Sequence, residues 1–321
     1  MADVIIIGAG PAGLSAAIYV QRAGKSALVL EAMTYGGQII NTPEVENYPG
    51  IQKISGFDFA TALYEQAVSL GAELVFDRAE KIEEKIEADP EETPEGMTGG
   101  ASAKKTRLLQ VTTAGGSVYE AKAVILATGA KNRKLGIERE QELTGRGVSY
   151  CATCDGAFYK GKPVAVNGGG NTALEDAMFL SNYCSRVYVI HRREGFRGEP
   201  QALEALRAKD NVEFVLNATV TGLLGEPKLT GVEVTDKLTG ETRELEVEGL
   251  FVAIGQEPEN HGFENVVALD PLGYISAGED CTTGTPGVFT AGDCRTKAVR
   301  QLTTAASDGA VAALAACSYI G

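Results

Sequence analysis

The first forty residues alternate between apolar runs and one glycine-rich turn. The apolar run 4–7 leads into the loop 8–13, with sequence GAGPAG, and a helical spacing of apolar residues then continues through Arg22. A second apolar run, 27–30, ends at the acidic residue Glu31. A continuous apolar strand, a glycine turn, a helix and a second buried strand together predict a βαβ unit.

The same pattern returns in the middle of the chain. The run 163–166 leads into the loop 168–173, with sequence GGGNTA, followed by a helical stretch through Tyr183 and an apolar run, 187–190, that ends at His191. In both copies 23 positions separate the first glycine from the residue that closes the second strand. One such glycine loop is a weak signal, but two in the same register strongly predict two dinucleotide-binding units.

Later strands complete each unit and set the domain order. Apolar runs that end in glycine turns occur at 123–130 and 250–255, and a further strand and turn at 287–293 precede an Ala-rich helix from about Leu302. We assign the last piece to the first domain, which makes the second domain an insertion. The predicted fold class is α/β, with two Rossmann-like dinucleotide-binding domains, one inserted into a discontinuous other. The predicted boundaries are 1–131 with 262–321 for the outer domain and 132–261 for the inserted one.

Residues 83–107 break this pattern. They combine seven acidic residues with prolines and glycines, which predicts a mobile polar surface loop, a solvated hairpin tip rather than a docking arm.

Composition narrows the class of protein. Acidic residues outnumber basic ones 43 to 29 for a net charge of -14, which disfavours binding to nucleic acid or to an anionic membrane. Six cysteines in 321 residues are too few for a disulfide scaffold, and neither a signal peptide nor a membrane span is apparent. We therefore expect a cytoplasmic protein.

The residues that close the second strands indicate different ligands. Glu31 can accept hydrogen bonds from a ribose 2′-hydroxyl and repels a 2′-phosphate, which fits FAD or NAD at the first loop. The equivalent position of the second copy carries His191, Arg192 and Arg193, with Arg197 close by. Guanidinium groups there can pair with a 2′-phosphate, which fits NADPH.

A third element lies between the two loops. Cys151 and Cys154 are spaced for a short-loop disulfide, with Asp155 adjacent, so one sulfur can attack, the other can resolve, and the acid can move a proton. A zinc site would need about four ligands, and the other cysteines form no second close pair. We expect redox chemistry and no metal.

Taken together, these motifs resemble the low-molecular-weight bacterial NADPH-dependent thioredoxin reductases over nearly the whole chain. The segments that carry the resemblance are 8–13, 36–38, 46–50, 151–156, 168–173, 191–193 through 197, 292–293 and 300–301.

The resemblance implies that FAD binds the outer domain and NADPH the inserted one, and that the protein is a homodimer. The implied FAD residues are Gly8, Gly10, Ala12, Gly13, Glu31, Gly37, Gln38, Asn47, Gly129, Gly292, Asp293, Arg300, Gln301 and Leu302. The implied NADPH residues are Gly168, Gly170, Asn171, Thr172, Ala173, His191, Arg192, Arg193 and Arg197.

The resemblance also implies roles in the reaction. Cys154 is the sulfur that faces the flavin, Cys151 attacks the partner disulfide, and Asp155 is the general acid. Electrons then run from NADPH through FAD and the two cysteines to thioredoxin, and the inserted domain is expected to swing on linkers near 131–136 and 256–262 to serve each step.

Two departures and three alternatives remain open. Asn167 stands where an aliphatic residue is usual, and the 83–107 segment is longer than the family pattern. Related flavoproteins serve a peroxidase or small dithiols, and a non-enzymatic NADPH and thiol redox sensor would carry the same motifs. The sequence does not identify which thioredoxin is the partner.

Overall fold

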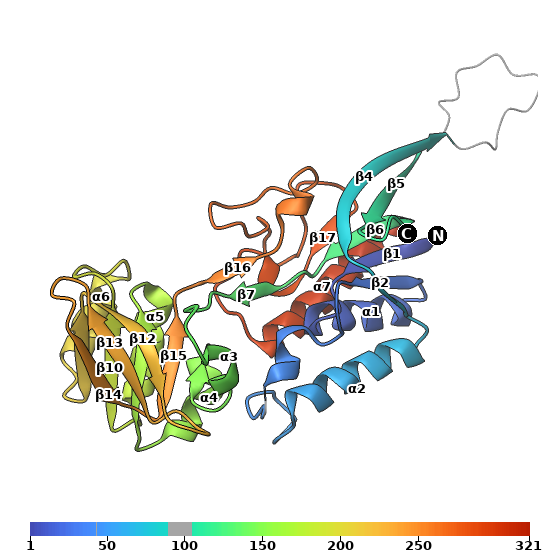
Figure 1. Cartoon of the computed structure of the whole chain (residues 1–321). Helices are drawn as coiled ribbons and strands as arrows, with labels where there is room; N and C mark the ends of the chain where they lie inside the picture. Colours follow the sequence, from blue (N-terminus) through green and yellow to red (C-terminus); the bar gives the residue numbers. More distant parts are fainter. Residues whose placement is uncertain (43, 89–104) are drawn as a thin grey trace, which may run out of the picture. The chain divides into compact units, whose positions relative to one another are not determined.

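The computed structural model describes residues 1–42, 44–88 and 105–321, which form two compact units (Figure 1). The first unit comprises Met1–Lys131 and Glu257–Gly321, and the second is the inserted segment Asn132–Gln256. The chain thus re-enters the first unit at Glu257, slightly before the expected position 262. The connecting strands β7 (Ala130–Asn132) and β16 (Gln256–Pro258) pair with each other.

The first unit is built on a seven-stranded sheet. Its parallel part has the order β3-β2-β1-β6, and β17 runs parallel to the second half of β6. Strands β4 and β5 continue the sheet beyond the first half of β6 as antiparallel neighbours. The strands are β1 (Ala2–Ile7), β2 (Ala27–Glu31), β3 (Glu73–Phe76), β4 (Ala79–Ala88), β5 (Lys105–Thr113), β6 (Val118–Leu126) and β17 (Val288–Thr290).

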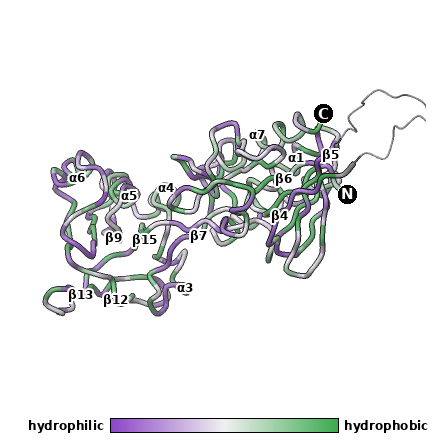
Figure 2. Tube along the Cα trace, turned by 90° about the horizontal axis from the view of Figure 1, so that it is seen from above, coloured by the Kyte–Doolittle hydropathy of each residue, from purple (hydrophilic) through white to green (hydrophobic). Residues whose placement is uncertain are grey.

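Both faces of this sheet are buried, which explains why its strands are continuous apolar runs. Val4 and Ile6 point into a core shared with helices α1 (Pro11–Arg22) and α7 (Leu302–Ile320). Ile5 and Ile7 point into a second core on the opposite face. The apolar run of β6 can be followed in Figure 2.

Helices α1 and α7 pack with their backbones in close approach. Ala12 and Ala16 of α1 meet Gly309 of α7, where an added Cβ would lie 2.1 Å from the Ala12 carbonyl oxygen. Only glycine fits at that crossing, so Gly309 determines how closely the C-terminal helix approaches the first glycine loop.

The remaining helices in the described part of this unit are α2, which has a side-chain N-cap, and three single-turn helices. The side chain of Ser55 caps α2 (Gly56–Ser69) by accepting a hydrogen bond from the Asp58 amide at 3.0 Å. The single-turn helices are η1 (Gly37–Asn41), η3 (His261–Phe263) and η4 (Gly292–Cys294). Within the described residues no helix has the length and apolar character needed to span a bilayer.

The second unit repeats the arrangement with a five-stranded parallel sheet of order β11-β10-β9-β15-β8. Helices α5 (Asn171–Ser181) and α6 (Pro200–Arg207) cover one face, and a three-stranded antiparallel sheet covers the other. Its other elements are α3 (Glu140–Leu143), β8 (Val148–Ser149), α4 (Ala152–Asp155), η2 (Gly156–Tyr159), β9 (Pro163–Gly168), β10 (Arg186–His191), β11 (Val212–Leu216), β12 (Ala218–Leu224), β13 (Gly231–Asp236), β14 (Thr242–Glu246) and β15 (Gly249–Ala253).

The two predicted βαβ units are therefore confirmed, with the same strand order around each. The half-buried side chain of Asn167 lies within β9, whose neighbours at that position are Ile190 and Val252. The strand is regular there, and the backbone pairing accommodates the unexpected amide.

The prediction of an irregular loop over 83–107 is wrong at both ends. Strand β4 continues to Ala88 and β5 begins at Lys105, so these ends form a hairpin. Glu84 pairs with Arg107 across the two strands at 2.9 Å. Such cross-strand ion pairs allow a charge-rich segment to form a strand. A prediction based on apolar residues therefore did not detect these strand ends. The rest of the predicted loop, 89–104, lies outside the described residues.

A buried carboxylate ties the C-terminal helix to the preceding turn. Asp308 of α7 is 5% exposed and accepts hydrogen bonds from the Gly292 amide at 2.9 Å, from Arg295 Nε at 2.8 Å and from Lys297 Nζ at 2.8 Å. Burial alone would raise the pKa of Asp308, but these donors hold it below its usual value.

Replacement of Asp308 with Asn should destabilise the first unit by about 3 kcal/mol, because it removes the buried anion of Lys297 and leaves Arg295 only the exposed Glu279. The measurement is urea denaturation of flavin-free protein. Since the folded pKa lies below the usual 3.8, the carboxylate stabilises the fold fully above that pH and loses its effect as the pH falls further.

The difference between wild type and Asp308→Asn should therefore narrow below about pH 3.8. Asp3→Asn provides the control, because its partner Lys122 is far more exposed than Arg295. An equal decrease in the free energy of unfolding in the two variants would contradict a special role for Asp308 and its buried cations.

Candidate functional site

The first glycine loop is shaped by two contacts that only glycine permits. Gly8 has φ +107°, and a Cβ there would lie 2.3 Å from the Ala127 carbonyl oxygen. A Cβ on Gly13 would lie 1.8 Å from the Gly8 carbonyl oxygen. Around Gly10, by contrast, a Cβ would meet only the Gly37 Cα atom at 3.9 Å, so the backbone there is open to a ligand. Ala12 is buried beneath the loop.

Glu31 lies at the end of β2 beside this loop. Its Oε2 accepts a hydrogen bond from the Ala9 amide at 2.8 Å, and its Oε1 accepts one from the Met33 amide at 3.0 Å. These bonds fix the carboxylate at the carboxyl edge of the sheet, while each oxygen keeps a lone pair for a further donor.

Other predicted residues of the first unit gather at the same loop. The Gly36 amide donates to the Ala9 carbonyl at 2.7 Å, which places Gly37 against Gly10. The side chain of Gln38 donates to the carbonyl of Ala130, next to Gly129. The structure therefore brings 37–38 and 129–130 to the glycine loop.

The C-terminal segment contributes a half-buried acid, Asp293. Gly292, with φ +83°, packs on Ala12, and Asp293 follows it. Asp293 Oδ1 is buried with no hydrogen-bond partner. Burial raises the pKa of Asp293, and the charges of Lys297 and Arg300 oppose that rise. A buried acceptor without a donor is rare in native proteins and indicates a site for a ligand hydroxyl.

Three further residues frame the same segment. Asn47 Nδ2 donates to Gln301 Oε1 at 3.2 Å. The Arg300 guanidinium lies over the ring of Tyr274 at 4.2 Å and donates to the Asp293 carbonyl at 3.4 Å. Leu302 is the first residue of α7.

These features fit FAD. The loop offers an open backbone and the start of α1 for a pyrophosphate, Glu31 offers acceptors for a ribose, and Asp293 offers an unused acceptor for a further hydroxyl group.

In the second unit the glycine loop rests on His191. A Cβ on Gly169 would lie 2.1 Å from the His191 ring, which is 6% exposed and stacks on Phe196. Burial lowers the pKa of His191, and the neighbouring arginines lower it further. The ring of His191 therefore supports the loop from below.

The arginines differ from His191 in exposure. Arg192, Arg193 and Arg197 are all exposed, and the Arg197 amide donates to the Gly169 carbonyl at 2.8 Å. Asn171 Oδ1 accepts from the Glu199 amide at 2.8 Å, which holds the segment after the arginines against the start of α5. This arrangement brings three exposed cations to the N-terminus of α5 and fits a phosphorylated nucleotide.

The remaining loop residues of this unit vary in exposure. Thr172 is exposed at the first turn of α5, Gly170 is its N-cap with open space at the Cβ position, and Gly168 and Ala173 are buried in contact with each other.

Cys151 and Cys154 form a disulfide at the start of the single-turn helix α4. Cys151 is the N-cap residue, and both cysteines are half-buried. Asp155 ends the helix, and its amide donates to the Cys151 carbonyl at 3.1 Å. The predicted pairing of the two cysteines is thus present, and Asp155 follows it directly in the sequence.

The Asp155 carboxyl is held by a residue that the sequence analysis missed. Ser149 donates to Asp155 Oδ2 at 2.6 Å. Burial raises the pKa of Asp155, and this hydrogen bond opposes the rise. The signal available in sequence was a serine two positions before Cys151, but its partner depends on the fold. Asp308 was also missed, although it is the one charged residue in the terminal helix 302–320.

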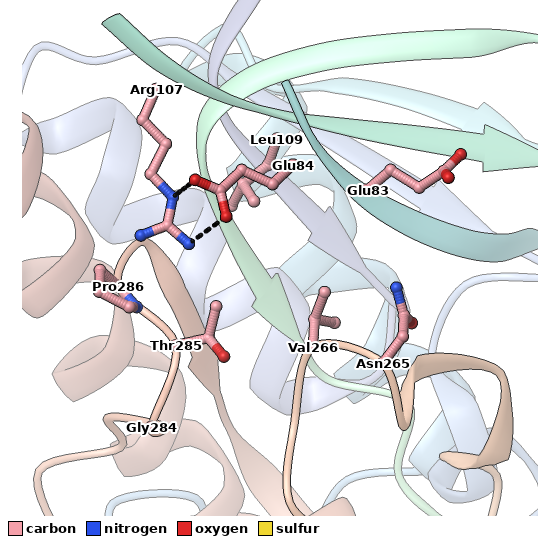
Figure 3. A pocket seen from close by; sticks show the side chains of 9 residues that line it. All are labelled: Glu83, Glu84, Arg107, Leu109, Asn265, Val266, Gly284, Thr285 and Pro286. Carbon is pink, nitrogen blue, oxygen red and sulfur yellow. Dashed lines mark hydrogen bonds and ion pairs between the residues drawn. The ribbon is translucent and has the colours of Figure 1, made fainter. Parts of the chain in front are cut away.

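A depression of about 440 Å³ lies elsewhere in the first unit, between the β4–β5 hairpin and the segments before β17 (Figure 3). None of the predicted site residues lines it, and its Arg107 is paired with Glu84. Among the residues the structure describes, no group of three or more His, Cys, Asp or Glu side chains is placed to hold a metal.

Comparison with known proteins agrees with this geometry. Residues 2–309 match the pyridine nucleotide-disulphide oxidoreductase family. Thioredoxin reductase of Bacillus subtilis is 41% identical over 99% of this chain and 94% of its own, and that of Streptomyces clavuligerus is 42% identical over the same shares. The crystal structure of thioredoxin reductase from Streptococcus pyogenes superposes with a TM-score of 0.88 at 36% identity, covering 99% of this chain and 98% of that one.

Two glycine loops at equivalent positions of the two units, a disulfide with an adjacent acid and full-length similarity therefore agree. The chain belongs to the pyridine nucleotide-disulphide oxidoreductases and, within them, to the low-molecular-weight thioredoxin reductases.

Proposed function

We propose that this protein is an NADPH-dependent thioredoxin-disulfide reductase that acts through FAD and the Cys151–Cys154 disulfide. The observation that carries the proposal is this disulfide, formed beside the half-buried acid Asp155 in the same unit as the exposed arginines. Its relatives' names support thioredoxin as the substrate.

The cofactor assignments follow from the two loops. FAD would be held by the glycine loop of the first unit, Glu31 and Asp293, and NADPH by the second loop with Arg192, Arg193 and Arg197. When bound, FAD supplies the transfer of an electron pair from NADPH to the disulfide. The four cysteines outside the pair are free, which supports a reducing compartment such as the cytoplasm, and family membership supports a homodimer.

The dithiol carries out the exchange with the partner. Asp155 takes the proton of the Cys151 thiol, and the thiolate attacks the partner disulfide to form a mixed disulfide and a partner thiolate, which takes that proton from Asp155. Cys154, deprotonated in turn, attacks Cys151 Sγ and releases the second partner thiolate, which is protonated in the same way. Two electrons and two protons thus pass to the partner, and Cys151–Cys154 is re-formed.

Replacement of Cys154 with Ser should trap a mixed disulfide between Cys151 and thioredoxin, because the resolving sulfur is missing. Non-reducing electrophoresis and mass spectrometry of the variant with oxidised thioredoxin measure the adduct after dithiothreitol pre-reduction. Cys151→Ser should give no adduct at this position, and Cys317→Ser, which removes a free cysteine of the other unit, should turn over normally. An adduct with Cys151→Ser alone would reverse the two roles.

Replacement of both Arg192 and Arg193 with Ala should raise the KM for NADPH by about a hundredfold and leave that for NADH little changed, because each phosphate contact contributes about 1.5–3 kcal/mol. Arg207→Ala removes an exposed charge of the same unit and should have little effect. Steady-state kinetics with both nucleotides measure the preference. A double variant that keeps its discrimination contradicts the NADPH assignment.

Replacement of Asp293 with Ala should weaken FAD binding by about tenfold or more, because the ligand loses a charged acceptor. The readout is the dissociation constant of FAD for the flavin-free protein, from fluorescence quenching. Asp280→Ala, an exposed acid of the same unit, is the matched control. Unchanged affinity in Asp293→Ala would mean that this acid does not contact the flavin.

A further inference from the structure

Ser149 occupies a rigid and buried position next to the disulfide. It is the last residue of the edge strand β8, pairs with Phe251 of the neighbouring strand β15 and is 2% exposed. Its side chain therefore cannot reach solvent, and its polar atom must be satisfied within the protein.

The Ser149 hydroxyl has three partners, all on or beside α4. It donates to Asp155 Oδ2 at 2.6 Å and accepts a hydrogen bond from the Cys151 amide at 3.1 Å. The Cys151 carbonyl oxygen lies 3.4 Å away and is also a possible acceptor for the hydroxyl. One side chain thus contacts both the acid and the backbone of the attacking cysteine.

This set of partners suits either protonation state of the acid. When Asp155 is a carboxylate, the hydroxyl donates to it. When Asp155 is protonated, its own O–H can donate to Ser149 Oγ, and the serine proton can turn to the Cys151 carbonyl. Neither state leaves a buried donor or acceptor unpaired at this point.

We propose that Ser149 is a positioning residue for the reductase reaction, holding the Asp155 carboxyl beside the dithiol and keeping it hydrogen-bonded before and after each proton transfer. The proposal rests on the proposed function, because it takes Asp155 as the group that relays the proton between the dithiol and the partner.

Other titratable groups lie around Asp155, and their effect on a pH profile must be distinguished from that of Asp155. Tyr159 of η2 has its pKa raised to about 12 by burial, with a smaller contribution from the charge of Asp155. Helix α5, which packs on α4, carries Asp176, and Tyr183 lies in the turn that follows this helix. Burial raises the pKa of Asp176 to about 7, so a pH dependence near neutrality could originate there. Cys184 is buried, and its pKa is raised to about 11.

The test is the pH dependence of thioredoxin reduction in the holoenzyme carrying Ser149→Ala. Without the hydroxyl, the Asp155 carboxylate loses its hydrogen-bond donor, which raises its pKa. The part of the pH–rate profile that reports the deprotonation of Asp155 should therefore move to higher pH. The maximal rate should fall about tenfold, because the carboxyl is no longer held in place. Ser149→Thr, which keeps the hydroxyl, should restore both. A wild-type profile in Ser149→Ala would overturn the proposal.

Two comparisons separate positioning from general stability. Ser181→Ala removes another buried hydroxyl of the same unit, bonded to the Met178 carbonyl at 2.7 Å, and should leave the profile unchanged. Ser149→Ala should lower the rate little further when added to Asp155→Asn, because it acts through that carboxyl. Equal effects in the wild-type and Asp155→Asn backgrounds would contradict the proposal. In the Asp176→Asn background, Ser149→Ala should still move the pH profile of thioredoxin reduction, because the shift originates at Asp155.

A partner-free readout distinguishes this proposal from the proposed function. The rate of Cys151 alkylation by iodoacetamide in dithiothreitol-reduced holoenzyme should show an inflection from Asp155 that Ser149→Ala moves to higher pH. If thioredoxin is not reduced by the wild type but this inflection still moves, the function fails and the positioning role stands. If thioredoxin is reduced and the inflection does not move, the positioning role fails alone.

Discussion

The first unit depends on one carboxylate surrounded by buried donors. Asp308 binds the turn at Gly292 and the cations of Arg295 and Lys297, and the next residue, Gly309, carries the helix against α1. Burial of two cations is tolerable only with such a partner. Through this cluster the terminal helix, the Gly292–Asp293 turn and the first glycine loop become one rigid group, and that group presents the unpaired acceptor of Asp293.

The two units show how one backbone arrangement acquires two specificities. Both place a glycine loop between the first parallel strand and its helix, and both end the next strand beside that loop. In the first unit the terminating residue is Glu31, bonded to the loop itself. In the second the equivalent residue is the buried His191, and the charge is moved to the exposed arginines that follow. Under the proposed function, two or three side chains distinguish the ligands of the two units, while the fold supplies the helix N-terminus in both cases.

Local signals predicted most of the fold and the site, since glycine loops, strand ends and a two-cysteine motif depend on residues close in sequence. Contacts that depend on strand pairing could not be predicted from local sequence in the same way. Ser149 meets Asp155 only because β8 is fixed on β15, and the inward ring of His191 depends on Phe196 folding back beneath it. The continuation of β4 and β5 into the range 83–107 was missed because these strand ends are joined by charge pairs such as Glu84–Arg107 and lack an alternating apolar face.

The interruption of the first unit between β6 and β17 has a consequence for synthesis on the ribosome. Strands β1 to β6 are translated first, but β17, Asp308 and the helix that packs on α1 emerge only after the whole inserted unit. The contiguous second unit can fold as soon as residue 256 has left the exit tunnel, whereas the first waits with an uncovered sheet edge and an exposed face of α1 until the last residues arrive. A ribosome stalled shortly before residue 321 would therefore carry the unit with Cys151 and Cys154 complete, while the first unit still lacked its terminal helix.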